Sequence, residues 1–467
     1  MDSIFETLLR YTKKHPQKLL FSFLDLGGRE TERYTYEAFV KRANVIAGHL
    51  RREYRFQSND RILLAYPPGL EIICAFFGCV RAGLIPVPVY PPSSHGSQAA
   101  LYRMAHIAKD CDAAGVLTSR DYYRSITTNL ERIVAPEDQD SQYVSNLKWI
   151  ASEDLLEPAS TDCDSGCDIL FLQYTSGSTT NPRGVMVTHA NILHNLTLVA
   201  NHSDPVAVSW LPQYHDMGLI GYYLYSALAG GTTYGFSAAD FIRRPALWFD
   251  TITRYQASAS SAPNFAFEYC LRPGRLSEET LEKVDLSSLR FLMTAAEPVR
   301  PATYQRFLQT FEPCGLKPEH FVVAYGLAEN TLAVTSYGRT VLSINKNASA
   351  LRRARAISQV SEISAAKQII SCGKPLGDVA VKIVDPEKHI VLEDGDIGEI
   401  WLGGKSKCRG YWNKPELTQE TFHARIIGGN QDEEGYLRTG DVGFLHDGEL
   451  YVCGRMKDMI IVRGQNY

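Results

Sequence analysis

Residues 171–187 combine hydroxyl side chains, glycines and one cation between two apolar runs. Hydroxyl groups and an arginine donate hydrogen bonds to phosphate oxygens, and glycine lets the backbone approach an oxyanion closely. This composition predicts a phosphate-binding loop, although a solvated hairpin is the alternative that it leaves open. The residues concerned are Thr175, Ser176, Gly177, Ser178, Thr179, Arg183 and Gly184.

The loop does not follow the Walker pattern. A Walker loop ends in Gly-Lys-Ser/Thr and runs directly into a helix. Here Val185 to Val187 indicate a second strand, after which Thr188 can cap a helix. We therefore expect a strand, the loop, a strand and then a helix.

Two further segments place small residues and a carboxylate after an apolar strand, at 294–298 and 325–329. The carboxyl ends of parallel strands open into crevices that bind nucleotides. Tyr325 can stack on a purine, and Glu329 with Thr175 can offer oxygen ligands to Mg²⁺. Ordinary turns between strand and helix are the alternative for either segment alone. Later, Asp441 offers a carboxylate for a ribose diol, and Arg455 lies two residues before Lys457, a possible pivot.

The elements that must position these residues alternate between helix and strand over the first two thirds of the chain. Residues 70–82 and 101–111 read as helices, and residues 84–90 and 115–118 read as strands. Such alternation predicts an α/β fold with a covered, largely parallel sheet.

The pattern changes to short strands and turns after Gly373, so a small β-rich subdomain is expected there. We expect strands at 436–439, 443–445 and 449–453, with Asp447-Gly448 as a hairpin turn. The polar run 341–370 precedes this part. Taken alone it predicts a solvated surface excursion.

Composition narrows the classes of partner. The 467-residue chain is 45% apolar, which suits a globular protein of several domains, and its net charge of −4 favours neither nucleic acid nor an anionic membrane as the main partner. Its longest apolar stretch, 72–90, is interrupted by Arg81, Pro86 and Pro88, so no stable membrane insertion is expected. We expect a cytoplasmic protein. Cys163 and Cys167 have neither a second pair nor a nearby histidine, and they make a poor zinc site.

Five motifs in this order resemble those of the adenylate-forming superfamily of acyl-CoA synthetases, peptide-synthetase adenylation domains and luciferases, over essentially the whole chain. They are the loop at 175–184 and the segments 294–298, 325–329, 436–441 and 454–458. Segments 66–71, 87–92 and 210–221 are similar to those of fatty-acyl-AMP ligases, and these enzymes also resemble this chain in having an inserted segment where 341–370 lies.

The resemblance implies the fold and its divisions. Residues 1–371 would form two packed α/β subdomains with mixed or parallel sheets in an αβαβα layering, including the insertion 341–370. Residues 372–456 would form a small β-barrel subdomain, and 457–467 would form the hinge, at Lys457, and the start of a C-terminal α+β lid domain. That lid is absent from this sequence, so we expect acyl-adenylate to form slowly.

The resemblance also implies the site residues. Thr175, Arg183, His215 and Glu329 would be catalytic, and Glu329 and Thr175 would bind Mg²⁺. The acyl entrance would be lined by His215, Met217, Gly218, Pro263, Asn264, Phe265 and Thr294. ATP and AMP would be bound by Thr175, Ser176, Gly177, Ser178, Thr179, Arg183, Ala295, Ala296, Glu297, Pro298, Tyr325, Gly326, Leu327, Asp441 and Arg455.

The implied activity is ATP-dependent activation of a fatty acid to acyl-adenylate. The acyl group would pass to an acyl carrier protein or to a carrier domain of a polyketide or peptide synthase, and the insertion would restrain the C-terminal domain so that coenzyme A is not used. A fatty-acid–CoA ligase and a catalytically weak nucleotide- or acyl-binding fragment are the alternatives. Three residues depart from the family pattern: Thr180 replaces a usual glycine, Arg183 a usual lysine and Asn330 a usual small residue.

Overall fold

The computed structural model describes residues 3–92, 98–133, 139–156, 167–175, 183–199, 204–345, 366–429, 434–456, 461–462 and 465–466. These residues form two compact units. The first comprises Met1–Leu193, His202–Arg243 and Tyr411–Pro415, and the second comprises His194–Asn201, Arg244–Gly410 and Glu416–Tyr467. None of the described helices is both long enough and apolar enough to cross a bilayer.

The first unit contains a four-stranded parallel sheet in the order β4-β3-β5-β6. Its strands are β3 (Arg61–Leu64), β4 (Ile85–Pro88), β5 (Ala113–Thr118) and β6 (Lys148–Ala151). The connecting helices are α3 (Glu71–Arg81), α4 (Gln98–Asp110), α5 (Arg120–Ile133) and α6 (Gln139–Asn146). The expected alternation of helix and strand is thereby confirmed, because every connection in a parallel sheet must cross over.

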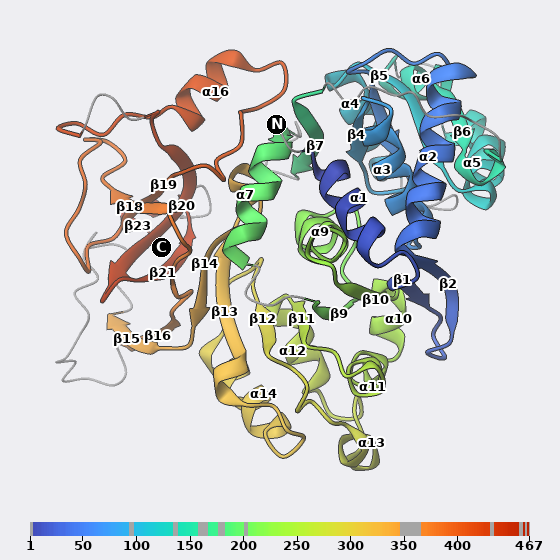
Figure 1. Ribbon diagram of the computed structural model, residues 1–467. Coiled ribbons are helices and arrows are strands. Elements are labelled where there is room, and N and C mark those ends of the chain that lie inside the picture. Colours follow the sequence, from blue (N-terminus) through green and yellow to red (C-terminus); the bar gives the residue numbers. More distant parts are fainter. Residues whose placement is uncertain are drawn as a thin grey trace. The chain divides into compact units, whose positions relative to one another are not determined.

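A second group of strands in this unit has the order β9-β10-β1-β2, with only the β1–β2 pair antiparallel. These strands are β1 (Leu19–Leu24), β2 (Glu30–Thr35), β9 (Val206–Ser209) and β10 (Thr232–Gly235), with α1 (Ile4–Lys14), α2 (Tyr36–Arg52) and α10 (Ala238–Arg243) around them in the sequence. The helix α2 packs closely on α3, since a side chain at Gly78 would come within 2.6 Å of Ile46 (Figure 1). Phe39 joins the layers by contacting both Phe21 and Phe77.

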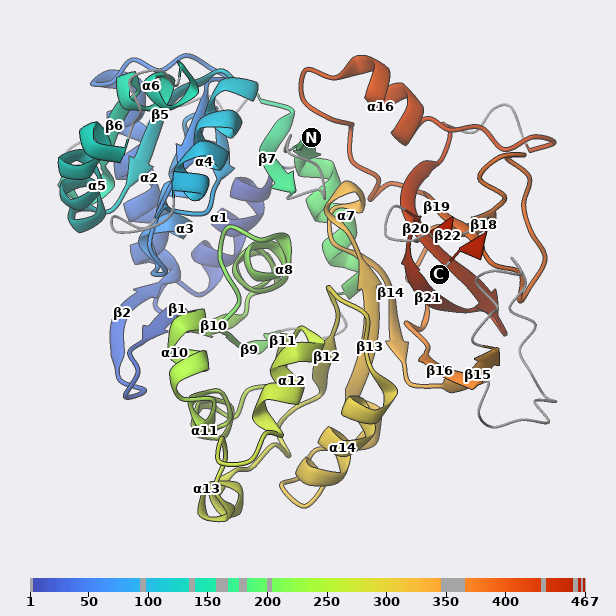
Figure 2. The same cartoon turned by 180° about the vertical axis from the view of Figure 1, so that it is seen from behind.

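The second unit is built on the strand order β17-β14-β13-β12-β11, in which β11, β12 and β13 are parallel. Its strands are β11 (Ala259–Ala262), β12 (Phe291–Thr294), β13 (Phe321–Gly326), β14 (Ala333–Gly338) and β17 (Lys374–Pro375). The helices beside them are α11 (Ala246–Tyr255), α12 (Asn264–Cys270), α13 (Glu278–Lys283) and α14 (Pro301–Phe311), as Figure 2 shows from behind. Aromatic rings join these layers, because Phe307 of α14 contacts Phe267 of α12, and Tyr304 stacks on Phe321 of β13.

The β-rich part of this unit is a four-stranded antiparallel sheet in the order β18-β19-β20-β21. Its strands are β18 (Ala380–Val384), β19 (Gly398–Gly403), β20 (Leu437–His446) and β21 (Glu449–Arg455), and α16 (Pro415–Phe422) lies between β19 and β20 in the sequence. The β-rich character expected after Gly373 is therefore confirmed, but the described strands do not close into a barrel, and the subdomain boundaries at 372 and 456 stay predictions. The two strands expected at 436–439 and 443–445 are one strand, β20, because the residues between them stay paired with β21.

The ends of the polar run 341–370 form an antiparallel ribbon rather than an irregular excursion. Strand β15 (Val341–Asn345) pairs with β16 (Ala366–Ile370), in register from Val341↔Ile370 to Asn345↔Ala366. Ile344 and Ile369 of the ribbon are buried in one cluster with Phe444 and Tyr451 of β20 and β21. The base of the run is thus fixed on the β-rich sheet, and residues 346–365 lie outside the described residues.

Candidate active site

The predicted phosphate loop begins and ends on an antiparallel ribbon of the first unit. Strand β7 (Ile169–Thr175) pairs with β8 (Arg183–Thr188), and Thr175 lies opposite Arg183 at the open end. Thr188 then caps helix α7 (His189–Val199), since its hydroxyl accepts a hydrogen bond from the Asn191 N–H at 3.1 Å. The two strands and the helix that follows them are confirmed, whereas residues 176–182 between the strands, with Ser176, Gly177, Ser178, Thr179 and Thr180, lie outside the described residues.

Arg183, the departure from the usual lysine, lies over an aromatic ring. Its guanidinium carbon is 5.3 Å from the centre of the Tyr411 ring. A planar guanidinium can stack on an aromatic face while its edge still donates hydrogen bonds, which the point charge of lysine does less well. The contact gives this arginine a fixed position at the end of β8.

Close packing against Tyr174 explains why residue 184 is glycine, and the sequence did not predict this contact. A side chain there would come within 2.8 Å of the Tyr174 ring, and the Gly184 carbonyl accepts a hydrogen bond of 2.7 Å from the Trp412 N–H. The Tyr174 hydroxyl donates to Asp110 at 2.6 Å, and Asp110 also binds Lys414 at 2.6 Å. Segment 411–415 thus holds the ribbon from outside, a role for which the sequence carried no recognisable signal.

His215 forms an ion pair with its neighbour Asp216, with a distance of 2.6 Å from Nδ1 to the carboxylate. Burial alone would lower the pKa of His215, but the Asp216 carboxylate outweighs burial and raises the pKa above its ordinary value of 6.5. Met217 is buried, and its N–H donates to the Asp216 carboxylate at 2.7 Å. A side chain at Gly218 would come within 2.2 Å of the Pro212 carbonyl, so this turn requires glycine. Their lining of an acyl entrance stays a prediction.

This loop continues into an unusual helix of three parts. They are α8 (Asp216–Gly218), a π-helical turn η2 (Leu219–Leu224) and α9 (Tyr225–Ala229). The Gln213 side chain also joins two of the motifs, because it donates to the Gly69 carbonyl at 2.6 Å and accepts from the Gly69 N–H at 3.1 Å. π-Turns are frequent at functional sites. The contact between Gln213 and Gly69 was not predicted from the sequence, because a single glutamine in an apolar loop is not a recognisable motif.

In the second unit, the carboxyl ends of β11 and β12 lie side by side, with Ala262 opposite Thr294. The Thr294 hydroxyl is buried and has no hydrogen-bond partner among the residues that the structure describes, so a ligand atom can bind there. Ala296 adopts a positive φ of 71°, and the Glu297 carboxylate accepts a hydrogen bond of 2.5 Å from the Phe265 N–H. The structure therefore brings the segments 263–265 and 294–298 together.

Tyr325 and Asp441, which are far apart in the sequence, are hydrogen-bonded. The Tyr325 hydroxyl donates to Asp441 Oδ2 at 2.6 Å, and Arg455 Nε lies 3.4 Å from Asp441 Oδ1. Burial, followed by the nearby Asp441, raises the pKa of Tyr325 well above its ordinary value, so the phenol stays protonated and keeps donating. The three residues assigned to adenine and ribose thus form one group, near the carboxyl ends of β13 and β21 and in the middle of β20.

Glu329 lies in the short helix η4 (Ala328–Asn330) that follows β13. Its backbone carbonyl accepts a hydrogen bond of 2.9 Å from the Cys408 N–H. Nearby Gly326 has no room for a side chain, which would lie 1.9 Å from the Leu332 carbonyl oxygen. Glu329 belongs to the second unit and Thr175 to the first, so their joint binding of Mg²⁺ stays a prediction.

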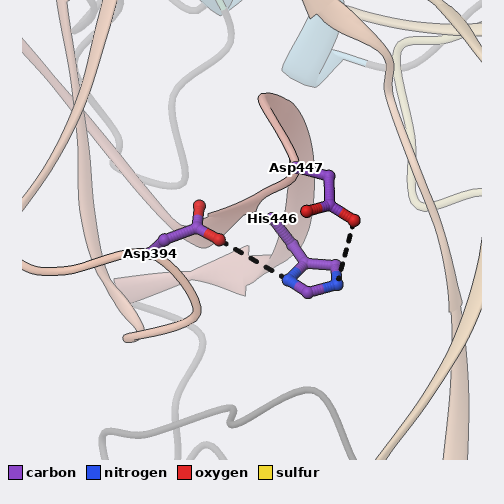
Figure 3. A group of neighbouring side chains, drawn as sticks. All are labelled: Asp394, His446 and Asp447. Carbon is purple, nitrogen blue, oxygen red and sulfur yellow. Dashed lines mark ion pairs between the residues drawn. The ribbon is translucent and has the colours of Figure 1, made fainter.

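One other cluster of metal-type ligands occurs among the described residues, at the turn between β20 and β21. Figure 3 shows His446 between two carboxylates, with Nδ1 3.6 Å from Asp394 and Nε2 3.6 Å from Asp447. The two ring nitrogens face different carboxylates, and the side chain of Asp447 is 89% exposed. This arrangement is that of surface ion pairs. Asp447-Gly448 forms the expected hairpin turn beside it.

A family model for AMP-binding enzymes matches residues 8–412. The chain belongs to this family. It is 37% identical to the medium-chain-fatty-acid–[acyl-carrier-protein] ligase JamA of Moorena producens, over 98% of this chain and 78% of that protein. It is 34% identical to the long-chain-fatty-acid–AMP ligase FadD26 of Mycobacterium marinum, over 100% of this chain and 80% of that protein.

Solved structures of AMP-binding enzymes share the fold. The fatty acyl-adenylate ligase from L. pneumophila, in complex with acyl adenylate and pyrophosphate, superimposes with a TM-score of 0.85 and 36% identity, covering 98% of this chain and 77% of that one. An adenylation domain of a keto acid-selecting peptide-synthetase module, bound to keto acyl adenylate, gives a TM-score of 0.85 at 25% identity, over 100% of this chain and 82% of that one. The α/β fold class expected from the motifs is confirmed.

Proposed function

We propose that this AMP-binding enzyme activates a fatty acid with ATP, forming acyl-adenylate and pyrophosphate, for transfer to the phosphopantetheine arm of a carrier protein. The observation that carries the proposal is the bonded group of Tyr325, Asp441 and Arg455, in which Tyr325 lies near the carboxyl end of β13. Relatives named as fatty-acid–AMP and fatty-acid–[acyl-carrier-protein] ligases support the same reaction and the carrier domain as partner.

The residues at these strand ends fit an adenine nucleotide. In our assignment, Ala295 to Pro298 and Tyr325 to Leu327 surround the adenine, while Asp441 and Arg455 hold the ribose. The buried, unpartnered Thr294 hydroxyl marks a polar position for a ligand atom, at the end of the acyl group in this assignment. Thr175 to Thr179 and Arg183 hold the β- and γ-phosphates.

The reaction is an in-line displacement at the α-phosphorus. A carboxylate oxygen of the fatty acid forms the new P–O bond, the bond to the bridging oxygen breaks, and pyrophosphate leaves with that oxygen. The protein mainly orients the reactants and neutralises charge in such transfers. Arg183, whose guanidinium lies over the Tyr411 ring, supplies a cation to the leaving group, and His215, whose raised pKa favours the cationic form, lies in the segment assigned to the acyl entrance.

A divalent cation fits the oxygen donors that this assignment provides. Mg²⁺ prefers carboxylates, hydroxyls and phosphate oxygens, and Glu329 and Thr175 are the proposed protein ligands. When bound, Mg²⁺ would offset the negative charge of the phosphates. The Glu329 carbonyl accepts a hydrogen bond from the Cys408 N–H, which supports an ordered backbone at this proposed ligand.

The ribbon β15–β16 supports a role for the insertion in excluding coenzyme A. Its base is buried against β20 and β21, the strands that carry Asp441 and Arg455 and lead to the proposed hinge at Lys457. An insertion anchored on these strands lies close in the fold to the proposed hinge. This position supports its proposed role of restraining a C-terminal domain that moves about the hinge.

Product identification tests the proposal. The chain is incubated with MgATP and a fatty acid, alone, with coenzyme A, or with a phosphopantetheinylated carrier protein, and the products are identified by mass spectrometry. We expect acyl-AMP in every reaction and acyl-carrier only in the third. Accumulation of acyl-CoA would favour a coenzyme A ligase, and ATP binding without pyrophosphate release, also when a C-terminal lid domain is supplied, would favour a binding protein. Asp441→Asn is the matched variant that should lose acyl-AMP formation.

A further inference from the structure

The chain reverses direction at Thr331 through a strained backbone turn. Thr331 has φ 70° and ψ −66°, and the Leu332 N–H donates to the Asn330 carbonyl at 2.8 Å, which defines a γ-turn with a positive φ at its centre. This conformation is rare, and for a β-branched residue it is a clear outlier. Strained residues persist only where the surrounding structure holds them, and they cluster at functional sites.

Buried hydrogen bonds with Asn195 and Ser406 hold this turn. The Thr331 hydroxyl donates to the Ser406 carbonyl at 2.7 Å. The Asn195 side chain binds both backbone groups of Ala333, at 3.0 and 3.1 Å, and also donates to the Ser406 hydroxyl at 2.9 Å. The side chains of Asn195, Thr331 and Ser406 are all fully buried, so each lost bond would leave a polar group unsatisfied.

Cys408 also contacts the turn, through both its backbone and its thiol. Its N–H donates to the Glu329 carbonyl at 2.9 Å, and its thiol contacts the Ala328 carbonyl at 3.3 Å and the Thr331 hydroxyl at 3.6 Å. The Thr331 N–H also donates to the Ala328 carbonyl at 3.0 Å. The backbone of residues 328–331 is therefore hydrogen-bonded at Glu329 itself and at the residues on both sides of it.

The turn also explains why the neighbouring strand end is so crowded. It brings the Leu332 carbonyl over Gly326, where no side chain fits, and so sets the segment against Tyr325. The backbone that carries Glu329 is thus fixed relative to the Tyr325–Asp441 pair.

We propose that Thr331, Asn195 and Cys408 are positioning residues that fix Glu329 for binding the divalent cation that accompanies ATP. The proposal rests on the role assigned to Glu329 in the proposed function. A metal ligand held in one orientation binds more tightly than one that must be ordered on binding, and residues that orient ligands typically change metal affinity 10- to 100-fold. The strain at Thr331 is the structural sign of such ordering.

Thr331→Val tests the proposal, with Thr335→Val as its matched control. Thr335 is equally buried, and its hydroxyl donates to a backbone carbonyl, that of Cys372, at the same 2.7 Å. Calorimetry would measure ATP binding over a series of Mg²⁺ concentrations, and thermal unfolding would be followed in parallel. We expect both variants to lower the melting temperature similarly, but only Thr331→Val to raise the Mg²⁺ concentration for half-maximal binding, by about tenfold. Thr331→Ser keeps the hydroxyl, so its Mg²⁺ concentration for half-maximal ATP binding should lie within about threefold of that of the original chain.

Glu329→Gln separates failure of this proposal from failure of the proposed function. If Glu329→Gln leaves the Mg²⁺ dependence unchanged, the assignment of Glu329 itself is wrong. If Glu329→Gln raises the Mg²⁺ requirement while Thr331→Val behaves like Thr335→Val, the positioning role is overturned. If Thr331→Val does not fold, Cys408→Ala carries the test: a rise of about threefold in the Mg²⁺ requirement supports the role, and no change overturns it.

Discussion

Each unit of this protein contains a tyrosine hydroxyl that donates to an aspartate, which in turn faces a cation. In the first unit, Tyr174 donates to Asp110 at 2.6 Å and Lys414 binds the same carboxylate at 2.6 Å. In the second, Tyr325 donates to Asp441 at 2.6 Å, but Arg455 is 3.4 Å away. Both groups join a phenol, a carboxylate and a cation, but the cation lies closer to the carboxylate in the first group than in the second.

The surroundings of the two groups explain the difference. Lys414 is 29% exposed and belongs to a segment that is also bonded to Gly184, so the first group joins two parts of one unit. Arg455 is 63% exposed at the end of β21, and the second group lies beside strand ends with the unpartnered Thr294 hydroxyl. A tyrosine–aspartate–cation group is therefore a structural joint when its cation is fixed, and a candidate site when its cation remains available to a ligand.

The largest expected effect is on catalysis, from Asp441→Asn. The variant keeps the side-chain shape but loses the charge that we assign to ribose binding, and hydrogen bonds to charged groups contribute about 1.5–3 kcal/mol each. We expect kcat/KM for ATP to fall about 100-fold, measured by pyrophosphate release. Asp110→Asn, the matched change in the other group, should alter it less than about threefold. Equal losses in the two variants would contradict the comparison.

Stability should show the reverse order. Asp110→Asn breaks the bonded group that holds the ribbon β7–β8, so we expect the free energy of unfolding to fall by about 2 kcal/mol. Asp441→Asn should lower it by less than about 1 kcal/mol, because its cation is already exposed to water. Urea denaturation of both variants measures this. A larger loss for Asp441→Asn would mean that the second group is the structural joint.

Gly184→Ala sharpens the structural side of the comparison. The added methyl group would come within 2.8 Å of the Tyr174 ring, and overpacking of this kind typically costs about 1–3 kcal/mol of stability. We expect a loss of about 1–2 kcal/mol in the original background and a smaller loss when Tyr174 is also changed to alanine. The double-mutant cycle measures this coupling. Equal losses in both backgrounds would show that Tyr174 is not the reason for glycine.

The smallest effect is expected for the pair of His215, whose side chain is half exposed, and its buried neighbour Asp216. Asp216 raises the pKa of His215, so the pair stabilises the fold when the histidine is charged, and this contribution is lost as the pH rises through the raised pKa, above 6.5. Because the His215 side chain is 54% exposed, we expect a contribution of less than about 1 kcal/mol. Unfolding of the original chain and of Asp216→Asn at pH 5.5 and 8.5 measures it. A difference that grows with pH would contradict the sign.

Motif order and hydrophobic pattern were sufficient for the family, the fold class and most elements. The helix predicted at 70–82 is α3, and the strand after the phosphate loop, at 185–187, lies within β8. Errors arose where local pattern is ambiguous. The Thr-Gly-Asp segment of β20 reads as a break because glycine and aspartate disfavour strands. The register with β19 does shift there, but Asp441 and Val442 pair with β21, and the strand continues.

The residues of the candidate site were named from short motifs, because phosphate, adenine and ribose each require particular donor types at particular strand ends. The sequence, through these motifs and the family they resemble, therefore predicted which side chains could bind ATP and the fatty acid, and these roles stay predictions. Only the tertiary structure decided which of them meet: the pairing of Tyr325 with Asp441, the hold of Asn195 and Ser406 on Thr331, and the packing of Tyr174 against Gly184. These contacts join segments far apart in the chain or depend on side-chain space, and neither is visible in a local pattern of residues.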